Sequence, residues 1–112
     1  MFRSDAEFLD DIKEAIRRIQ TYIAGVNYNQ FIDDTKIQDA VVRNLEIIGE
    51  AAKNISGKIK KQYPEISWKH MAALRDRLIH HYFGINYDIV WEIITVELPK
   101  EYSLMAQINQ GE

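Results

Sequence analysis

Apolar residues recur at every third or fourth position along most of this 112-residue chain, and this spacing constrains the fold more than any other feature. It places apolar side chains on one face of an α-helix, whereas a half-buried strand requires strict alternation. Only two prolines, Pro64 and Pro99, interrupt the pattern. The spacing predicts an all-α, up-and-down bundle of four to five helices that forms one domain over residues 1–112.

Helix boundaries in the first half of the chain are indicated by capping residues. Ser4 and Glu7 have the spacing of a capping box, so a first helix should begin after Ser4 and end before Gly25. A short turn, which could be helical, is expected at 29–33. A second helix should run over 35–55 with Asp34 as its N-cap. Its interior Gly49 costs helix stability, which predicts close backbone contact with a neighbouring helix.

The sequence of the second half of the chain predicts two more helices, which a lysine-rich connection over 58–64 joins to the first two. One helix should start near Ser67 and continue through Tyr82, with an apolar face that includes Trp68, Met71, Leu74 and Leu78. The last should cover 88–108 as one helix kinked at Pro99, because the apolar residues keep their phase on both sides of the proline.

The composition excludes several classes of protein. There is no cysteine, so disulfides and thiolate zinc sites are impossible. The residues after Met1 turn acidic at once, and no apolar run approaches the length of a membrane span. We therefore expect a cytoplasmic protein without a signal peptide or a membrane partner.

Charge is distributed unevenly along the chain. Residues 1–50 carry a net charge of −4, residues 51–83 carry +5, and residues 84–112 carry −4. The basic middle also holds all three histidines, His70, His80 and His81. A local basic patch is typical of a phosphate-binding surface, although a solvated lysine-rich surface explains the charge alone equally well.

The segment over 74–83 carries the residues that could take part in catalysis. At about 100° per residue, Arg75 and Tyr82 share one helix face, while His80 lies about 140° around the axis from Arg75. Asp76 is the neighbour of His80 one turn earlier. One straight helix therefore does not aim Arg75 and His80 at a common phosphate. Either the helix distorts near His80 or a second protomer completes the site.

The arrangement Arg75-x-x-x-x-His80-x-Tyr82, with Asp76 directly after the arginine, resembles the motif of HEPN domains. It is most similar to the HepT toxins of HEPN–MNT toxin–antitoxin pairs. Residues 43–51, 64–68 and 82–91 also resemble successive family segments, so the likeness covers most of the chain. Ala73 is a departure, since the family has glycine there; the difference concerns local packing and no proposed catalytic residue.

The resemblance implies a homodimeric, metal-independent endoribonuclease that needs no cofactor and has its active site at the dimer interface. The chemistry of the residues is compatible with that role. His80 can act as base or acid near neutral pH. The planar, permanently charged Arg75 suits phosphate oxygens and transition-state charge. Asp76 would support these two groups by orienting His80 or balancing Arg75. Candidates for contacts with the RNA backbone are Lys58, Lys60, Lys61, Lys69 and Arg77.

Tyr82 has a separate implied role. The resemblance implies an MNT-type nucleotidyltransferase antitoxin that transfers AMP to this tyrosine. A bulky anionic group beside the arginine and histidine would block RNA. The apolar stripe also contains Tyr82, so a buried core tyrosine remains the alternative for this residue.

Ordinary structural roles compete with several of these assignments. Arg43, Glu46 and Glu50 share a helix face, which favours an ion-pair cluster, with support of Arg75 as a further option. Trp68 and Trp91 are typical core or interface anchors. The spacing of the three histidines matches no common zinc site, so no metal is expected. The competing function is a non-enzymatic helical dimer that acts as regulatory or nucleotide-binding partner of a nucleotidyltransferase.

Overall fold

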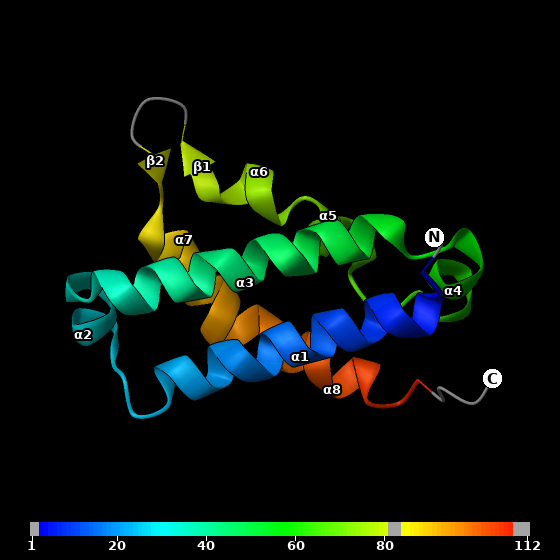
Figure 1. Ribbon diagram of the computed structural model, residues 1–112, viewed down its shortest axis with the longest axis horizontal. Coiled ribbons are helices and arrows are strands. Elements are labelled where there is room, and N and C mark those ends of the chain that lie inside the picture. Colours follow the sequence, from blue (N-terminus) through cyan, green and yellow to red (C-terminus); the bar gives the residue numbers. More distant parts are fainter. Residues whose placement is uncertain (1–2, 81–83, 109–112) are drawn as a thin grey trace.

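The computed structural model describes residues 3–80 and 84–108, and of His80 it describes the backbone. Its longest elements are α1 (Asp5–Ile23) and α3 (Thr35–Asn54), which run side by side (Figure 1). Both predicted N-caps are confirmed. The Ser4 hydroxyl accepts a hydrogen bond from the Glu7 N–H, and the Glu7 carboxylate accepts one from the Ser4 N–H. The Asp34 carboxylate accepts from the Ile37 N–H at 3.1 Å.

Two short helices close the ends of this pair. The turn expected at 29–33 is the helix α2 (Tyr28–Asp33), and Phe31 within it is fully buried. The buried amide of Gln38 on α3 donates to the carbonyl oxygens of Phe31 and Ile32 at the end of α2.

The expected connection over 58–64 is instead helical for most of its length, as α4 (Gly57–Gln62). The Ser56 hydroxyl caps it by accepting from the Ile59 N–H. Asp5 at the start of α1 accepts from both the N–H and the hydroxyl of Ser56, which fixes where α4 begins.

The predicted continuous helix from Ser67 to Tyr82 is wrong. It is divided into α5 (Trp68–Ala72) and α6 (Leu74–Leu78), and the chain then becomes extended in β1 (Ile79–His80). The first break falls at Ala73, whose φ of −92° and ψ of 7° lie outside the helical region. The apolar face itself is confirmed, because every one of its described members is buried: Trp68, Met71, Leu74 and Leu78.

The strand β1 pairs antiparallel with β2 (Gly84–Ile85), with Ile79 opposite Ile85 and His80 opposite Gly84. The pair projects from the helices beyond α6, at the upper left of Figure 1. Gly84 has a φ of 74°, the left-handed conformation that glycine adopts readily. Asn86 then donates its N–H to the carbonyl of Leu78, which ties the returning chain to the end of α6.

The last helical segment follows the predicted path with a different distortion. It comprises α7 (Tyr87–Glu92), the π-helical turn η1 (Ile93–Glu97) and α8 (Leu98–Met105). The irregularity therefore extends over the five residues of η1, which precede Pro99. Proline has no N–H to donate and its ring crowds the preceding turn, which accounts for the wider turn at this point.

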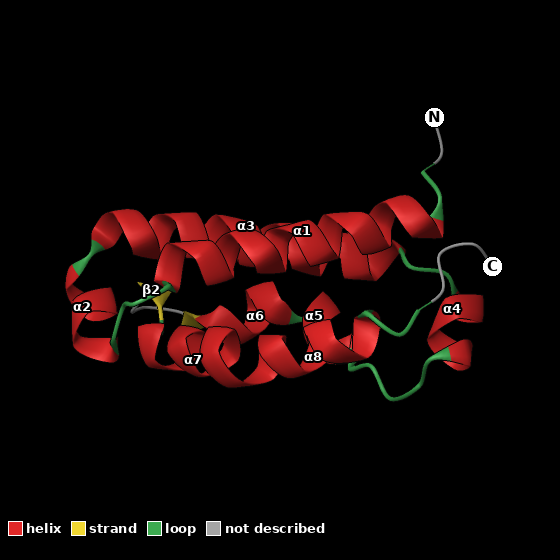
Figure 2. Ribbon diagram, turned by 90° about the horizontal axis from the view of Figure 1, so that it is seen from below, coloured by secondary structure: helices red, strands yellow, loops and turns green. Residues whose placement is uncertain are grey.

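The helices form two layers with the core between them (Figure 2). One layer holds α1 and α3, and the other holds α5 to α8 with η1. Glu101 of α8 is buried in the second layer and accepts a hydrogen bond from the Ser67 N–H, directly before α5. The all-α fold class is confirmed. None of the helices in the described part of the chain has both the length and the hydrophobicity to cross a membrane.

Candidate functional site

Arg75 is exposed because α6 rests on the core through its other face. Leu74 and Leu78 are 1% and 2% exposed, while Arg75 and Asp76 point to solvent. Burial of these two leucines fixes the rotation of α6 about its axis. The guanidinium of Arg75 is therefore available to a ligand.

The helix ends between Arg75 and His80. Ile79, with a φ of −94° and a ψ of 123°, is already extended, so helical geometry no longer relates the two residues. Distortion of the helix near His80 was one of the two arrangements predicted to relieve their angular separation. The side chain of His80 and the whole of Tyr82 lie outside the described residues, as do His81 and Phe83.

Arg75 lines a cleft of about 210 Å³ between α3 and the α5–α6 segment. The other lining residues are, in order along the chain, Arg43, Glu46, Gly49, Glu50, Lys53 and Ala72. We call this site the α3–α6 cleft. Its walls carry three cations and two carboxylates, and its two smallest lining residues are Gly49 and Ala72.

The predicted close approach at Gly49 is confirmed. A Cβ added at Gly49 would lie 3.3 Å from the main-chain oxygen of Met71 and 3.8 Å from the Cβ of Leu74. The missing side chain thus allows α5 to pack directly against the backbone of α3. This contact sets the distance between the helix that carries Glu46 and Glu50 and the helix that carries Arg75.

The expected ion-pair cluster of Arg43, Glu46 and Glu50 does not form. Within residues 3–80 and 84–108, none of the five charged side chains of the α3–α6 cleft takes part in an ion pair. Helical spacing brings these groups within reach of each other, but it does not orient them. Sequence analysis also missed Lys53 as a member of the site, although it follows Glu50 by three residues on the same face.

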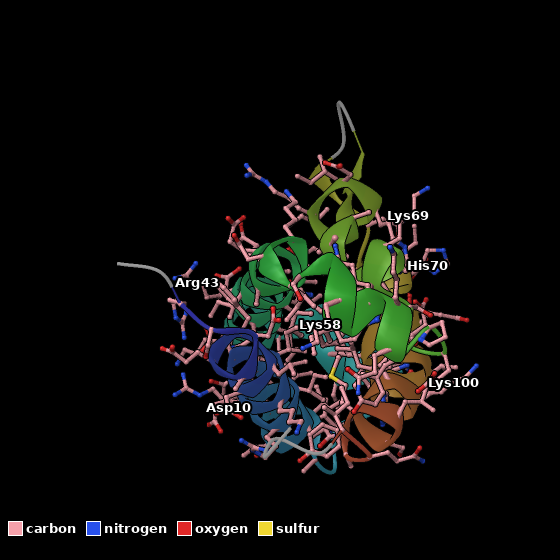
Figure 3. The ribbon with its side chains drawn as sticks, turned by 90° about the vertical axis from the view of Figure 1, so that its right-hand side faces the viewer. Asp10, Arg43, Lys58, Lys69, His70 and Lys100 are labelled. Carbon is pink, nitrogen blue, oxygen red and sulfur yellow. The ribbon has the colours of Figure 1, made fainter. Side chains whose placement is uncertain are left out.

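The candidate RNA-contacting lysines lie elsewhere on the surface. Lys60 and Lys69 line a groove of about 660 Å³ together with His70. Figure 3 shows Lys69 and His70 on the opposite side of the molecule from Arg43. Lys58 and Lys61 are exposed on α4. The basic residues of the middle of the chain are therefore spread over separate surfaces, and Arg75 lines the α3–α6 cleft.

Arg77 faces a third direction and is engaged with an acidic partner. Its guanidinium donates two hydrogen bonds, of 2.9 and 2.8 Å, to the two carboxylate oxygens of Glu97 on η1. The bonds to Glu97 raise the pKa of Arg77, and partial burial opposes that shift. The paired guanidinium links α6 to the C-terminal helical segment.

Aromatic residues support the chain just after the motif. Phe31 of α2 contacts the rings of Tyr87 and Trp91 on α7, with centroid distances of 6.2 and 5.1 Å. The Tyr28 hydroxyl donates to the Asp88 carboxylate, and this bond raises the pKa of Tyr28. The contacts confirm the prediction that Trp91 is an anchor, and they hold α7 against α2 beside β2.

A metal centre finds no support in the part of the chain that the structure describes. There, no three His, Cys, Asp or Glu side chains are placed to hold a metal ion. The chemical groups gathered around Arg75 are cations and carboxylates, which suit a ligand that carries phosphate oxygens and N–H donors.

The two helical layers, with an interrupted helix that carries Arg75, define an all-α protein. A family model described as "Ribonuclease HepT-like" matches residues 12–108. The chain belongs to the HepT-like ribonuclease family.

Individual relatives agree with this assignment. The chain is 44% identical to "Probable ribonuclease HepT" of Thermococcus cleftensis over 99 residues, which are 88% of this chain and 90% of that protein. It is 45% identical to a protein of Methanocaldococcus jannaschii that is provisionally named an RNase, over 90% of this chain and 84% of the relative. No solved structure matches the chain significantly.

Proposed function

We propose that this protein is the ribonuclease toxin of a toxin–antitoxin pair and cleaves RNA internally without a metal ion. The observation that carries the proposal is the exposed Arg75 in a net cationic cleft whose charged side chains form no ion pairs within the described residues, one turn before the chain leaves the helix at Ile79. Membership of the HepT-like ribonuclease family supports RNA as the substrate.

The proposed reaction uses the 2′-hydroxyl of the RNA itself. The 2′-oxygen bonds to the adjacent phosphorus while the bond from phosphorus to the 5′-oxygen breaks. A base takes the 2′-hydroxyl proton, and an acid supplies a proton to the departing 5′-oxygen. The products are a 2′,3′-cyclic phosphate and a 5′-hydroxyl. Arg75 stabilises the negative charge that develops on the phosphate oxygens.

His80 provides the proton transfers in this scheme, since imidazole exchanges protons near neutral pH. A homodimer with its two-fold axis near α6 would supply two histidines, one as base and the other as acid. Asp76, exposed beside Arg75, would orient His80 or balance the arginine. The lysines at 58, 60, 61 and 69 are proposed to attract the RNA backbone. Arg77 could contact the RNA only after its bonds to Glu97 break.

Control of the enzyme is proposed to act at Tyr82 through an MNT-type nucleotidyltransferase. Transfer of AMP joins the tyrosine oxygen to the α-phosphorus of ATP and releases pyrophosphate. The new phosphate would compete with RNA for Arg75. Intact mass of protein co-expressed with that partner should show added adenylate units, and Tyr82→Phe should remove them; an adduct retained by the Phe variant would place the modification elsewhere.

Cleavage of end-labelled RNA in EDTA tests the central proposal. The unmodified protein should generate fragments with 2′,3′-cyclic phosphate ends. Arg75→Ala should reduce the rate about 100-fold, because one transition-state donor is lost, and His80→Ala should reduce it about 100-fold or more. Lys100→Ala on α8 is the matched control, since Lys100 is exposed outside the cleft.

Two outcomes would contradict the proposal. Intact RNA across a range of pH would remove the enzyme activity and favour the non-enzymatic regulatory dimer. Equal rates for His80→Ala and the unmodified protein would remove the role assigned to His80, provided that both unfold at the same temperature.

A further inference from the structure

The lining of the α3–α6 cleft combines both signs of charge in a way that a simple polyanion site does not require. Arg43, Lys53 and Arg75 are cationic, whereas Glu46 and Glu50 are acidic. A surface that binds only phosphates gains from lysine and arginine and is weakened by carboxylates. The two glutamates therefore point to a ligand that also donates hydrogen bonds.

Glu46 and Glu50 also repel each other in the absence of such a donor. They are four residues apart on α3, the spacing at which like charges destabilise a helix by about 0.2–0.5 kcal/mol. No ion pair from the described chain compensates either carboxylate, although Arg43 and Lys53 each lie three residues from one of them. Both carboxylates are free to accept hydrogen bonds from a bound molecule.

The cleft narrows at its base, where α5 packs against the backbone of α3 at Gly49, and its charged side chains line the space above that contact. Gly49 contributes only backbone, and Ala72 on the opposite wall contributes one methyl group. The cleft has a volume of about 210 Å³, well above what one water molecule requires.

A nucleotide supplies both kinds of group that the lining selects. Its phosphate matches the cations, and an exocyclic amine on its base matches the carboxylates. Adenine, cytosine and guanine carry such an amine. Uracil has a carbonyl oxygen at the equivalent position of the cytosine ring, and that oxygen would be repelled by a carboxylate.

We propose that the α3–α6 cleft binds one nucleotide of the RNA next to the cleaved linkage, and that Glu46 and Glu50 select bases with an exocyclic amine over uracil. Arg75 holds the phosphate in this arrangement, so the nucleotide is read where the chain is cut. The inference rests on the proposed ribonuclease function, and it adds a preference among RNA sequences.

Equilibrium binding of mononucleotides tests the selection without any cleavage. Titration calorimetry or NMR of the unmodified protein should show CMP binding about tenfold more tightly than UMP, the effect of about 1.4 kcal/mol for one bond to a charged acceptor. GMP should bind more tightly than IMP by a similar factor, because these two nucleotides differ only in the exocyclic amine. Glu46→Gln, Glu50→Gln and the double variant should bring both ratios towards one.

Glu65→Gln is the matched control, because Glu65 is exposed outside the cleft. It should leave both ratios unchanged. Equal binding of CMP and UMP by the unmodified protein would overturn the proposal. Unchanged ratios in the double variant would also overturn it, and a fall in cleavage that is equal for all RNAs would then assign the glutamates to the positioning of Arg75.

Cleavage of RNA oligonucleotides that differ in one base separates this inference from the proposed function. Cutting with no preference for C over U beside the linkage contradicts the base selection and leaves the ribonuclease standing. Intact RNA together with a CMP preference that the double variant loses contradicts the ribonuclease and leaves a nucleotide-binding cleft.

Discussion

The pair α1 and α3 and the segment over 68–80 differ in regularity, although both pack on the same core. The pair has 19 and 20 residues in uninterrupted helices with side-chain N-caps. The segment has two five-residue helices without side-chain N-caps and then an extended chain. The long helices supply stability, whereas the interrupted segment exposes Arg75 at a point where the backbone changes direction. Breaks in regular structure thus accompany the candidate site.

The first prediction compares a buried isoleucine of α3 with an exposed one of β1. Ile48 is 0% exposed, so Ile48→Ala should lower the free energy of unfolding by about 4 kcal/mol through lost burial and a cavity. Ile79 is 48% exposed, and Ile79→Ala should change it by less than about 0.5 kcal/mol. Urea unfolding measures both. A large loss from Ile79→Ala would show that a second chain covers this segment in solution.

The second prediction concerns the contact that joins the two regions. Gly49→Val should lower the free energy of unfolding by about 3 kcal/mol, because its side chain would displace the backbone of α5 from α3. Gly57→Val is the control, since a Cβ there meets nothing within 4 Å. If both variants unfold alike, the close approach does not determine the packing of α5.

The third prediction concerns the ion pair that links α6 to η1. Arg77→Met should lower the free energy of unfolding by about 1 kcal/mol, since the pair is bidentate but its side chains remain about one-third exposed. A double-mutant cycle with Glu97→Met isolates the pair, and added salt should reduce its coupling. A coupling near zero at low salt would mean that α6 is held by its two leucines alone.

The regular region was predictable because its determinants are local. Apolar spacing, the capping box at Ser4 and the cap at Asp34 each depend on residues within one or two turns. The close approach at Gly49 was predictable for a related reason: an interior glycine costs stability unless packing requires it.

The interrupted region was not predictable from spacing, because distant residues determine it. Alanine has the highest helix propensity of any residue type, yet the helix breaks at Ala73. The N–H of Ser67 bonds Glu101, and the carbonyl of Leu78 accepts from Asn86, so both ends of the segment are set from elsewhere. These contacts come from residues outside the segment, so apolar spacing within the segment does not reveal them.

The candidate site was predictable in part. Arg75 was identified from the motif, whereas its exposure follows from the burial of Leu74 and Leu78 on the other face of α6. The absence of ion pairs among Arg43, Glu46 and Glu50 was not predictable. Helical spacing brings these side chains close enough to pair but does not fix the direction in which they point. The bond between Arg77 and Glu97 joins residues 20 apart, and no local pattern indicates it.

The contact at Gly49 has a consequence for how freely this protein can vary. The atom nearest to the absent side chain is the main-chain oxygen of Met71, not its thioether. The contact therefore requires no particular side chain at position 71, provided that the apolar residue there fills the same space in the core. The approach of α5 to α3 therefore depends on the residue at position 49 more than on the side chain at position 71, so these two neighbouring positions should differ sharply in the substitutions they accept.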